Sequence, residues 1–122
     1  MSKTVMIVDD SSSLRTVVSL ALKRAGYDVV EAEDGQCALT AAKAKMPDVI
    51  LLDWNMPVMN GYEFLLAVRK EAGGEKPVII FCTTENEMSQ IMKAMEAGAN
   101  EYIMKPFDRE TLEGKLLTGL SA

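Results

Sequence analysis

The sequence predicts an α/β fold of five strand–helix units, in which helices cover both faces of an open parallel sheet. Five short apolar runs show no polar alternation, as expected for parallel strands that are buried on both faces. Segments between these runs carry apolar residues at helical spacing. The 122 residues suit one domain spanning 1–122 and are too few for an eight-stranded barrel.

The five strand segments recur at regular intervals along the chain. They are Thr4–Val8, Val29–Val30, Val49–Leu52, Val78–Cys82 and Tyr102–Met104. Pro47 and Pro77 stand just before the third and fourth segments, and Pro106 follows the fifth. Because proline cannot donate a hydrogen bond to a strand ladder, these prolines mark strand boundaries.

A segment with helical spacing follows each strand. The apolar stripes are Leu14, Val17, Val18, Ala21, Leu22 and Ala25; Ala38, Leu39, Ala41 and Ala42; Phe64, Leu65 and Val68; Met88, Ile91, Met92 and Met95; and Leu112, Leu116 and Leu120. Asp34 and Asn60, each followed by glycine, are expected to cap the second and third helices at their N-termini. Gly26 and Gly98 are expected to end the first and fourth.

For five such units we expect the flavodoxin-like strand order 2-1-3-4-5, a common arrangement of open parallel α/β folds. In this order the first and third strands are neighbours, and ligands bind at the carboxyl ends of the strands. Polar residues stand at these ends in the sequence: Asp9 and Asp10, Asp53, Thr83 and Thr84, and Lys105. We therefore expect the functional site at this edge of the sheet.

The composition restricts the chemistry of such a site. The chain has no histidine, which excludes Ser-His and Cys-His catalysis and zinc sites that need His ligands. The formal net charge is −5 and no cluster of Lys and Arg occurs, so we expect no nucleic-acid partner. The apolar runs are too short to span a membrane. Cys37 and Cys82 are expected to be unpaired, which fits a cytoplasmic protein.

Three carboxylates at neighbouring strand ends would repel one another. Two unit charges about 4 Å apart repel by roughly 4 kcal/mol at an effective dielectric constant near 20. The cluster therefore needs either a cation or bound protons, and oxygen ligands without His or Cys suit Mg²⁺. An aspartate beside Mg²⁺ and Lys105 can attack phosphorus and form an aspartyl phosphate. Asp53 is the better candidate for this nucleophile, and Asp9 with Asp10 for the metal ligands.

These residues resemble the receiver domain of two-component response regulators, in its single-domain, CheY-like chemotaxis form. The motifs that carry the resemblance are Val8-Asp9-Asp10, Leu52-Asp53-Trp54-Asn55-Met56-Pro57 with Asn60-Gly61, Thr83, and Tyr102 followed by Lys105-Pro106-Phe107. The resemblance covers the whole chain, and the five motifs in this order are highly specific as a set. Receiver domains are themselves an example of the order 2-1-3-4-5, so that order is not independent support.

The resemblance implies a role for each residue of the site. Asp53 would be the phosphoacceptor, and Lys105 would pair with the phosphoryl group. Asp10 and Asp53 would bind Mg²⁺ directly, Asp9 would act largely through water, and the backbone carbonyl of Asn55 would be a further ligand.

The resemblance also implies a conformational switch. Thr83 would move toward the phosphoryl oxygen while the ring of Tyr102 turns inward. The methionine-rich fourth helix either packs in the core or leaves an apolar side exposed beside this tyrosine. In the second case, Ile91, Met95 and Tyr102 form part of a partner surface.

Three further positions are expected to set the lifetime of the phosphorylated state. Asn55 and Glu85 stand two residues after Asp53 and Thr83, where the chemotaxis type tunes the loss of phosphate. Thr84 replaces the Ala or Gly that is usual in the family, and its larger side chain is expected to narrow access to the acceptor.

The implied function is a signalling switch. A sensor histidine kinase or a phosphotransfer protein would phosphorylate Asp53, and the altered surface around the fourth helix, fifth strand and fifth helix would control a partner protein in chemotaxis or motility. The protein would be a monomer without an output domain and not an enzyme, although it would catalyse its own phosphorylation and dephosphorylation. The segment Asn86-Glu87-Met88 is acidic where motor-binding relatives tend to be basic, which weakens the inference of a flagellar partner.

Other functions use the same chemistry or the same fold. A phosphate shuttle or sink in a phosphorelay would need the same residues. An aspartyl-phosphate phosphatase of the haloacid dehalogenase type would want a second acid two residues after Asp53, where Asn55 stands. Flavin binding would need a phosphate loop after the first strand, where Asp9 and Asp10 would repel a phosphate.

Overall fold

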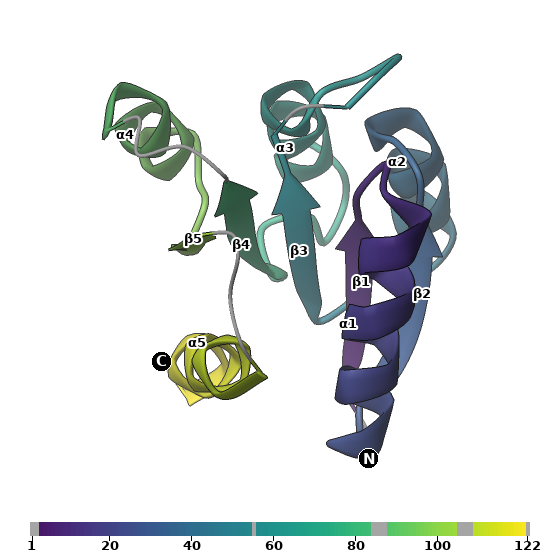
Figure 1. Ribbon diagram of the computed structural model, residues 1–122. Helices are drawn as coiled ribbons and strands as arrows, with labels where there is room; N and C mark the ends of the chain where they lie inside the picture. Colours follow the sequence, from purple (N-terminus) through teal and green to yellow (C-terminus); the bar gives the residue numbers. More distant parts are fainter. Residues whose placement is uncertain (1–2, 55, 84–87, 105–108, 122) are drawn as a thin grey trace.

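The computed structural model describes residues 3–54, 56–83, 88–104 and 109–121, in which five strands and five helices alternate (Figure 1). The strands are β1 (Thr4–Val8), β2 (Asp28–Ala32), β3 (Val49–Asp53), β4 (Val78–Thr83) and β5 (Glu101–Met104). The helices are α1 (Ser12–Arg24), α2 (Gly35–Ala44), α3 (Gly61–Arg69), α4 (Met88–Glu96) and α5 (Arg109–Ser121).

The strands form one parallel sheet in the order β2-β1-β3-β4-β5, which confirms the predicted fold class. Val8 at the end of β1 lies in register with Ala32 of β2 on one side and Leu52 of β3 on the other. The carboxyl ends of β1 and β3 are therefore side by side, and the residues that follow them share one edge of the sheet.

Each face of the sheet has its own core, because successive residues of a strand point to opposite faces. Met6 and Val8 of β1 pack in a core with residues of α2, α3 and α4, whereas Val5 and Ile7 pack in a core with residues of α1 and α5. Figure 1 shows the corresponding layers, with α1 and α5 on one side of the sheet and the other three helices on the opposite side. This two-sided burial explains the continuous apolar runs in the sequence.

The helix ends agree with the predicted caps. The side chain of Asp34 accepts a hydrogen bond from the N–H of Cys37 at the start of α2, and Asn60 forms a capping box with Glu63 at the start of α3. Gly26 and Gly98, which follow α1 and α4, have positive φ angles of 97° and 115°. These conformations favour glycine, and they confirm the two predicted helix ends.

Two apolar stripes contain residues that the structure places at the surface. Val17 of α1 is 67% exposed and Met92 of α4 is 56% exposed, whereas Ala94 of α4 is only 2% exposed and faces the core. The stripes read from the sequence are therefore wider than the buried face of each helix.

Strand β2 extends beyond the predicted segment Val29–Val30, and it lies at the edge of the sheet. Its exposed residues, which include Asp28 and Glu31, hid the strand from a search for continuous apolar runs. Neither Cys37 nor Cys82 forms a disulfide, as expected; Cys82 is buried and Cys37 is exposed. No helix among the described residues is long and apolar enough to cross a membrane.

Candidate functional site

Three aspartates meet at the carboxyl ends of β1 and β3. Asp9 follows β1 and is 3% exposed, Asp10 is exposed, and Asp53 is the partly buried last residue of β3. One carboxylate oxygen from each lies within 4.8 Å of the other two. The structure thus brings together the three acids that the strand order placed at this edge.

The turn from β1 to α1 is held by backbone and side-chain hydrogen bonds around Asp9. Its N–H donates to the carbonyl oxygen of Ala32 at 3.1 Å, and its Oδ1 accepts from the N–H of Ser11 at 2.9 Å. Arg15 donates from Nη1 to the carbonyl oxygen of Asp9 at 2.5 Å. Ser11 also caps α1, since its hydroxyl accepts from the N–H of Leu14 at 3.2 Å. The direction in which Asp9 and its neighbour project is therefore defined by this turn.

The start of α3 approaches the end of β3 closely. The N–H of Gly61 donates to the carbonyl oxygen of Trp54 at 2.9 Å. A Cβ atom on Gly61 would lie 2.2 Å from the carbonyl oxygen of Asp53 and 3.0 Å from a ring carbon of Phe81. Only glycine permits this approach. The sequence motif pointed to the position but not to this packing reason.

The loop between β3 and α3 contains a strained residue. Val58 has a φ of 68° and is 81% exposed, although a β-branched side chain disfavours this conformation. The loop is tied to α2, because the N–H of Gly35 donates to the carbonyl oxygen of Met59 at 3.1 Å.

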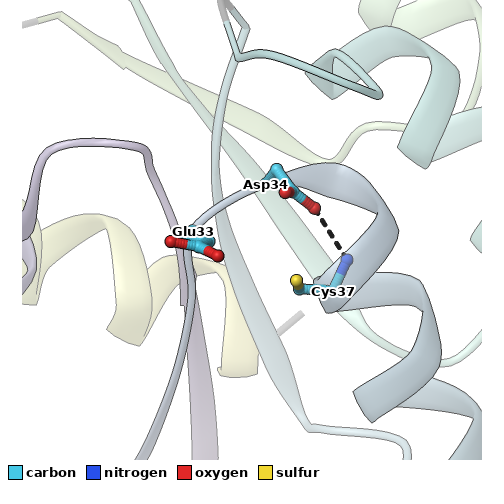
Figure 2. Close-up of side chains that lie close together, drawn as sticks. All are labelled: Glu33, Asp34 and Cys37. Atoms are coloured by element: carbon cyan, nitrogen blue, oxygen red, sulfur yellow. Dashed lines mark hydrogen bonds between the residues drawn. The ribbon is translucent and has the colours of Figure 1, made fainter.

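A second group of possible metal ligands lies at the start of α2. Figure 2 shows Glu33, Asp34 and Cys37, whose ligand atoms also lie within 4.8 Å of one another. The Oδ1 of Asp34 accepts from the N–H of Cys37 at 2.8 Å as the helix cap. A hydrogen bond with Asp34, together with partial desolvation and the nearby acids, raises the pKa of the Cys37 thiol. The thiol therefore keeps its proton near neutral pH, which opposes metal binding because the thiolate is the ligand.

The all-carboxylate group of Asp9, Asp10 and Asp53 is the better match to a metal ion. Hard oxygen donors of this kind are the ligands that Mg²⁺ prefers, usually with waters completing its octahedral shell. The ion would also remove the repulsion among the three acids. The residues present thus fit the cation expected from the sequence.

An aromatic stack begins at the residue that follows Asp53. The ring of Trp54 stacks on that of Tyr62 of α3, with ring centroids 5.5 Å apart. It also contacts the ring of Phe81 of β4, with ring centroids 5.3 Å apart. Lys93 of α4 places its Nζ 4.4 Å from the centroid of the Tyr62 ring. The tryptophan is part of the motif around Asp53, but nothing in the sequence indicated these partners.

The residues expected to form a partner surface lie together. Ile91, Met95 and Tyr102 line one shallow pocket between α4 and β5, which Trp54 also lines. Met95 is 41% exposed. The structure therefore places the expected surface beside Trp54, the residue that follows Asp53.

The remaining predicted site residues are described in part or not at all. Thr83 is the last residue of β4 and lies in register with Met104 of β5. The others lie outside the described residues, and their roles stay predictions: Asn55, Thr84, Glu85 and Lys105.

Comparisons with known proteins give a consistent family. Residues 5–117 match the response regulator receiver domain. The chain is 41% identical over 113 residues to chemotaxis protein CheY1 of Helicobacter pylori, a match that covers 91% of each chain. The structure of Vibrio cholerae chemotaxis protein CheY4 has a TM-score of 0.93 at 40% identity and covers 98% of this chain and 99% of that chain.

A third comparison concerns a solved receiver domain with a metal ion. The receiver domain of sensor histidine kinase PA1611 from Pseudomonas aeruginosa, which has a magnesium ion coordinated in its active-site cleft, has a TM-score of 0.91 at 29% identity and covers 100% of both chains. The chain therefore belongs to the response regulator receiver domain family, and within it to the CheY-like phosphorylation-dependent switches of two-component systems.

Proposed function

We propose that this receiver domain accepts a phosphoryl group on Asp53 and then changes the surface that it offers to a partner protein, in chemotaxis or motility control. The observation that carries the proposal is the meeting of Asp9, Asp10 and Asp53 at the ends of β1 and β3. The chemotaxis proteins of Helicobacter pylori and Vibrio cholerae, which match nearly the full chain, support a role in chemotaxis.

In the reaction, a carboxylate oxygen of Asp53 attacks the phosphorus of a phosphohistidine. The O–P bond forms as the N–P bond breaks, and the imidazole of the donor leaves with the electron pair of that bond. Asp10 and Asp53 would hold Mg²⁺ directly, with Asp9 through water and the carbonyl of Asn55 as a further ligand. When bound, the ion supplies positive charge to the phosphoryl oxygens.

Other side chains complete the chemistry. Lys105 pairs with the phosphoryl group, and water later hydrolyses the acyl phosphate to restore the carboxylate of Asp53. Asn55, Thr84 and Glu85 set how fast the phosphate is gained and lost. The protein acts in this way on its own carboxylate and does not turn over an external substrate.

The donor in this proposal is a sensor histidine kinase or a phosphotransfer protein, because the chain has no histidine of its own. Thr83 and Tyr102 transmit the change, and the target binds the surface that includes Ile91 and Met95. Ile91, Met95 and Tyr102 line one pocket together with Trp54, which supports this assignment. The absence of a disulfide at Cys37 and Cys82 supports a cytoplasmic location, and we expect the protein to act as a monomer.

The test is phosphorylation by a small donor. The chain is incubated with Mg²⁺ and acetyl phosphate, or with beryllofluoride, and followed by mass spectrometry and Trp54 fluorescence. The wild type is expected to gain one phosphoryl group, and Asp53→Asn, which keeps the shape but lacks the nucleophile, is expected to gain none. Asp28→Asn is the matched control, because it removes the same charge from the exposed edge strand β2.

Each alternative result has a definite meaning. Phosphorylation of the Asp53→Asn variant would contradict the acceptor assignment. Steady turnover of phosphate esters would indicate a phosphatase instead. Rapid transfer of phosphate from the chain back to the kinase, with no change in binding to any motor component, would favour a phosphate shuttle or sink.

A further inference from the structure

Arg15 ties the turn after β1 to the neighbouring edge strand. Its Nη1 donates to the carbonyl oxygen of Asp9 at 2.5 Å, and its Nε donates to Oε1 of Glu31 on β2 at 3.2 Å. The side chain of Arg15 is only 16% exposed, compared with 41% for Glu31. Because the guanidinium is planar and presents its donors in a rigid fork, these two bonds together restrict the turn.

The restricted turn carries two of the three acids of the site. Asp9 is the residue whose carbonyl Arg15 holds, and Asp10 follows it directly. Mg²⁺ demands a near-octahedral arrangement of oxygens at about 2.0–2.1 Å. A small displacement of the turn would therefore weaken binding of the ion.

The charge of Arg15 has the opposite effect on a bound cation. A guanidinium near the acid cluster repels Mg²⁺, so its removal would by itself tighten binding. Glu31 and Glu33 line the same hollow as Arg15, and their negative charge would be less compensated without it. Geometry and charge thus predict effects of opposite sign, which a measurement can separate.

We propose that Arg15 is a positioning residue for the metal-binding turn, and that its hydrogen bonds to the Asp9 carbonyl and Glu31 hold Asp9 and Asp10 in the geometry that binds Mg²⁺. The inference rests on the proposed function, since it needs the ion at that site. It assigns a task to a side chain outside the acidic cluster.

The experiment compares Mg²⁺ binding by wild type, Arg15→Met, Arg15→Lys and Arg24→Met. Binding is followed by Trp54 fluorescence and by the Mg²⁺-dependent rise in melting temperature. Arg24 is the matched control, because it is exposed and lies about 13 Å along the same helix.

We expect Arg15→Met to weaken Mg²⁺ binding about tenfold, as is typical for residues that orient metal ligands. Arg15→Lys keeps a charged donor but lacks the rigid fork, so it should recover only part of the lost Mg²⁺ binding. Arg24→Met should not weaken binding.

A double variant tests whether Arg15 and Glu31 act together. Glu31→Gln is expected to weaken Mg²⁺ binding less than Arg15→Met does, and Arg15→Met with Glu31→Gln is expected to be no weaker than Arg15→Met alone. Additive losses would overturn the proposal, as would unchanged or tighter binding by Arg15→Met. If wild type shows no Mg²⁺ response, or a response that Asp53→Asn retains, the proposed function fails as well. If the wild-type response is lost in Asp53→Asn but is unchanged in Arg15→Met, only the role of Arg15 fails.

Discussion

At the scale of single residues, the end of β3 packs against a glycine that has no side chain. Gly61 begins α3 directly against the backbone of Asp53, where a Cβ atom would lie 2.2 Å from the carbonyl oxygen. The contact is with backbone rather than with a flexible side chain, so it cannot be relieved without moving either α3 or the end of β3. The position of Asp53 is thus linked to the packing of α3.

Gly61→Ala is therefore expected to lower the free energy of unfolding by about 1–3 kcal/mol, the usual cost of overpacking. It should also weaken the response of Trp54 fluorescence to Mg²⁺, because the end of β3 must shift. Urea unfolding measures the first effect and a metal titration the second. Gly114→Ala is the control, because a Cβ there meets nothing within 4 Å. On the exposed face of α5, alanine should instead raise stability by about 0.5–1 kcal/mol. Equal behaviour of the two variants would contradict the packing argument.

The sequence predicted the acids of the site but not the side chains that pack beside it. Asp9, Asp10 and Asp53 could be found because the ends of parallel strands share one edge, so position in the chain implies position in space. Arg15 and Tyr62 could not, because their contacts depend on the path of long side chains between elements. No local spacing encodes that path.

At the scale of elements, one arginine joins several connecting segments near the N-terminal ends of β4 and β5. Arg69, the last residue of α3, donates from Nε and Nη2 to the carbonyl oxygen of Gly98 at 3.1 and 2.6 Å. Its Nη1 donates to the carbonyl oxygens of Gly74 at 2.8 Å and Pro77 at 2.9 Å, and its Nη2 donates to Oδ1 of Asn100 at 2.9 Å. Burial lowers the pKa of this guanidinium. The turn after α4 and the approach to β4 are thus joined through one side chain.

Arg69→Lys is expected to lower the free energy of unfolding by about 2–4 kcal/mol, because an ammonium cannot reach all these acceptors and leaves some of them unsatisfied. Urea unfolding followed by circular dichroism measures the change. Amide exchange should also accelerate at Ile79, whose N–H donates to the same Asn100 oxygen at 2.8 Å. Arg24→Lys, on the exposed end of α1, should change stability by no more than about 0.5 kcal/mol. A similar small effect at both positions would show that Arg69 does not act as this link.

Elements with a strong local signal were predicted well, and those shaped by tertiary contacts less well. Asp34 and Asn60 were recognised as caps because a cap is a local hydrogen bond between neighbours in sequence. The segment predicted for the edge strand β2 was too short, because exposed Asp28 and Glu31 interrupt its apolar pattern. The exposure of Met92 could not be read from periodicity, since it depends on where α4 sits against the sheet.

At the scale of the whole molecule, strand order is a property that no single segment contains. Periodicity supplies the number of strands, while their order came from the general behaviour of parallel folds and from the family resemblance. The two cores explain why one arrangement suits the sequence: Met6 and Val8 pack toward α2, α3 and α4, and Val5 and Ile7 toward α1 and α5. The same order brings the ends of β1 and β3 together, so the fold itself assembles the acidic site.

Assembly of this site has an electrostatic cost. The chain already has a formal net charge of −5, and folding brings three of its acids within 4.8 Å of one another. In the unfolded chain Asp53 is separated from the other two by a flexible segment, so most of this repulsion belongs to the folded state. A bound cation stabilises the folded state because it binds there and not to the unfolded chain.

Asp53→Asn is therefore expected to raise the free energy of unfolding in the absence of Mg²⁺ by about 1 kcal/mol, a value near the aqueous limit because Asp10 is exposed. In wild type, Mg²⁺ at ten times its dissociation constant should add about 1.4 kcal/mol, and the variant should lose most of that gain. Melting curves with and without Mg²⁺, at matched ionic strength, measure both effects. Asp28→Asn removes the same charge from the edge of the sheet and should leave the Mg²⁺ gain intact. If the gain persisted in Asp53→Asn, the ion would be stabilising the chain from another place, and the group Glu33, Asp34 and Cys37 would be the next to test.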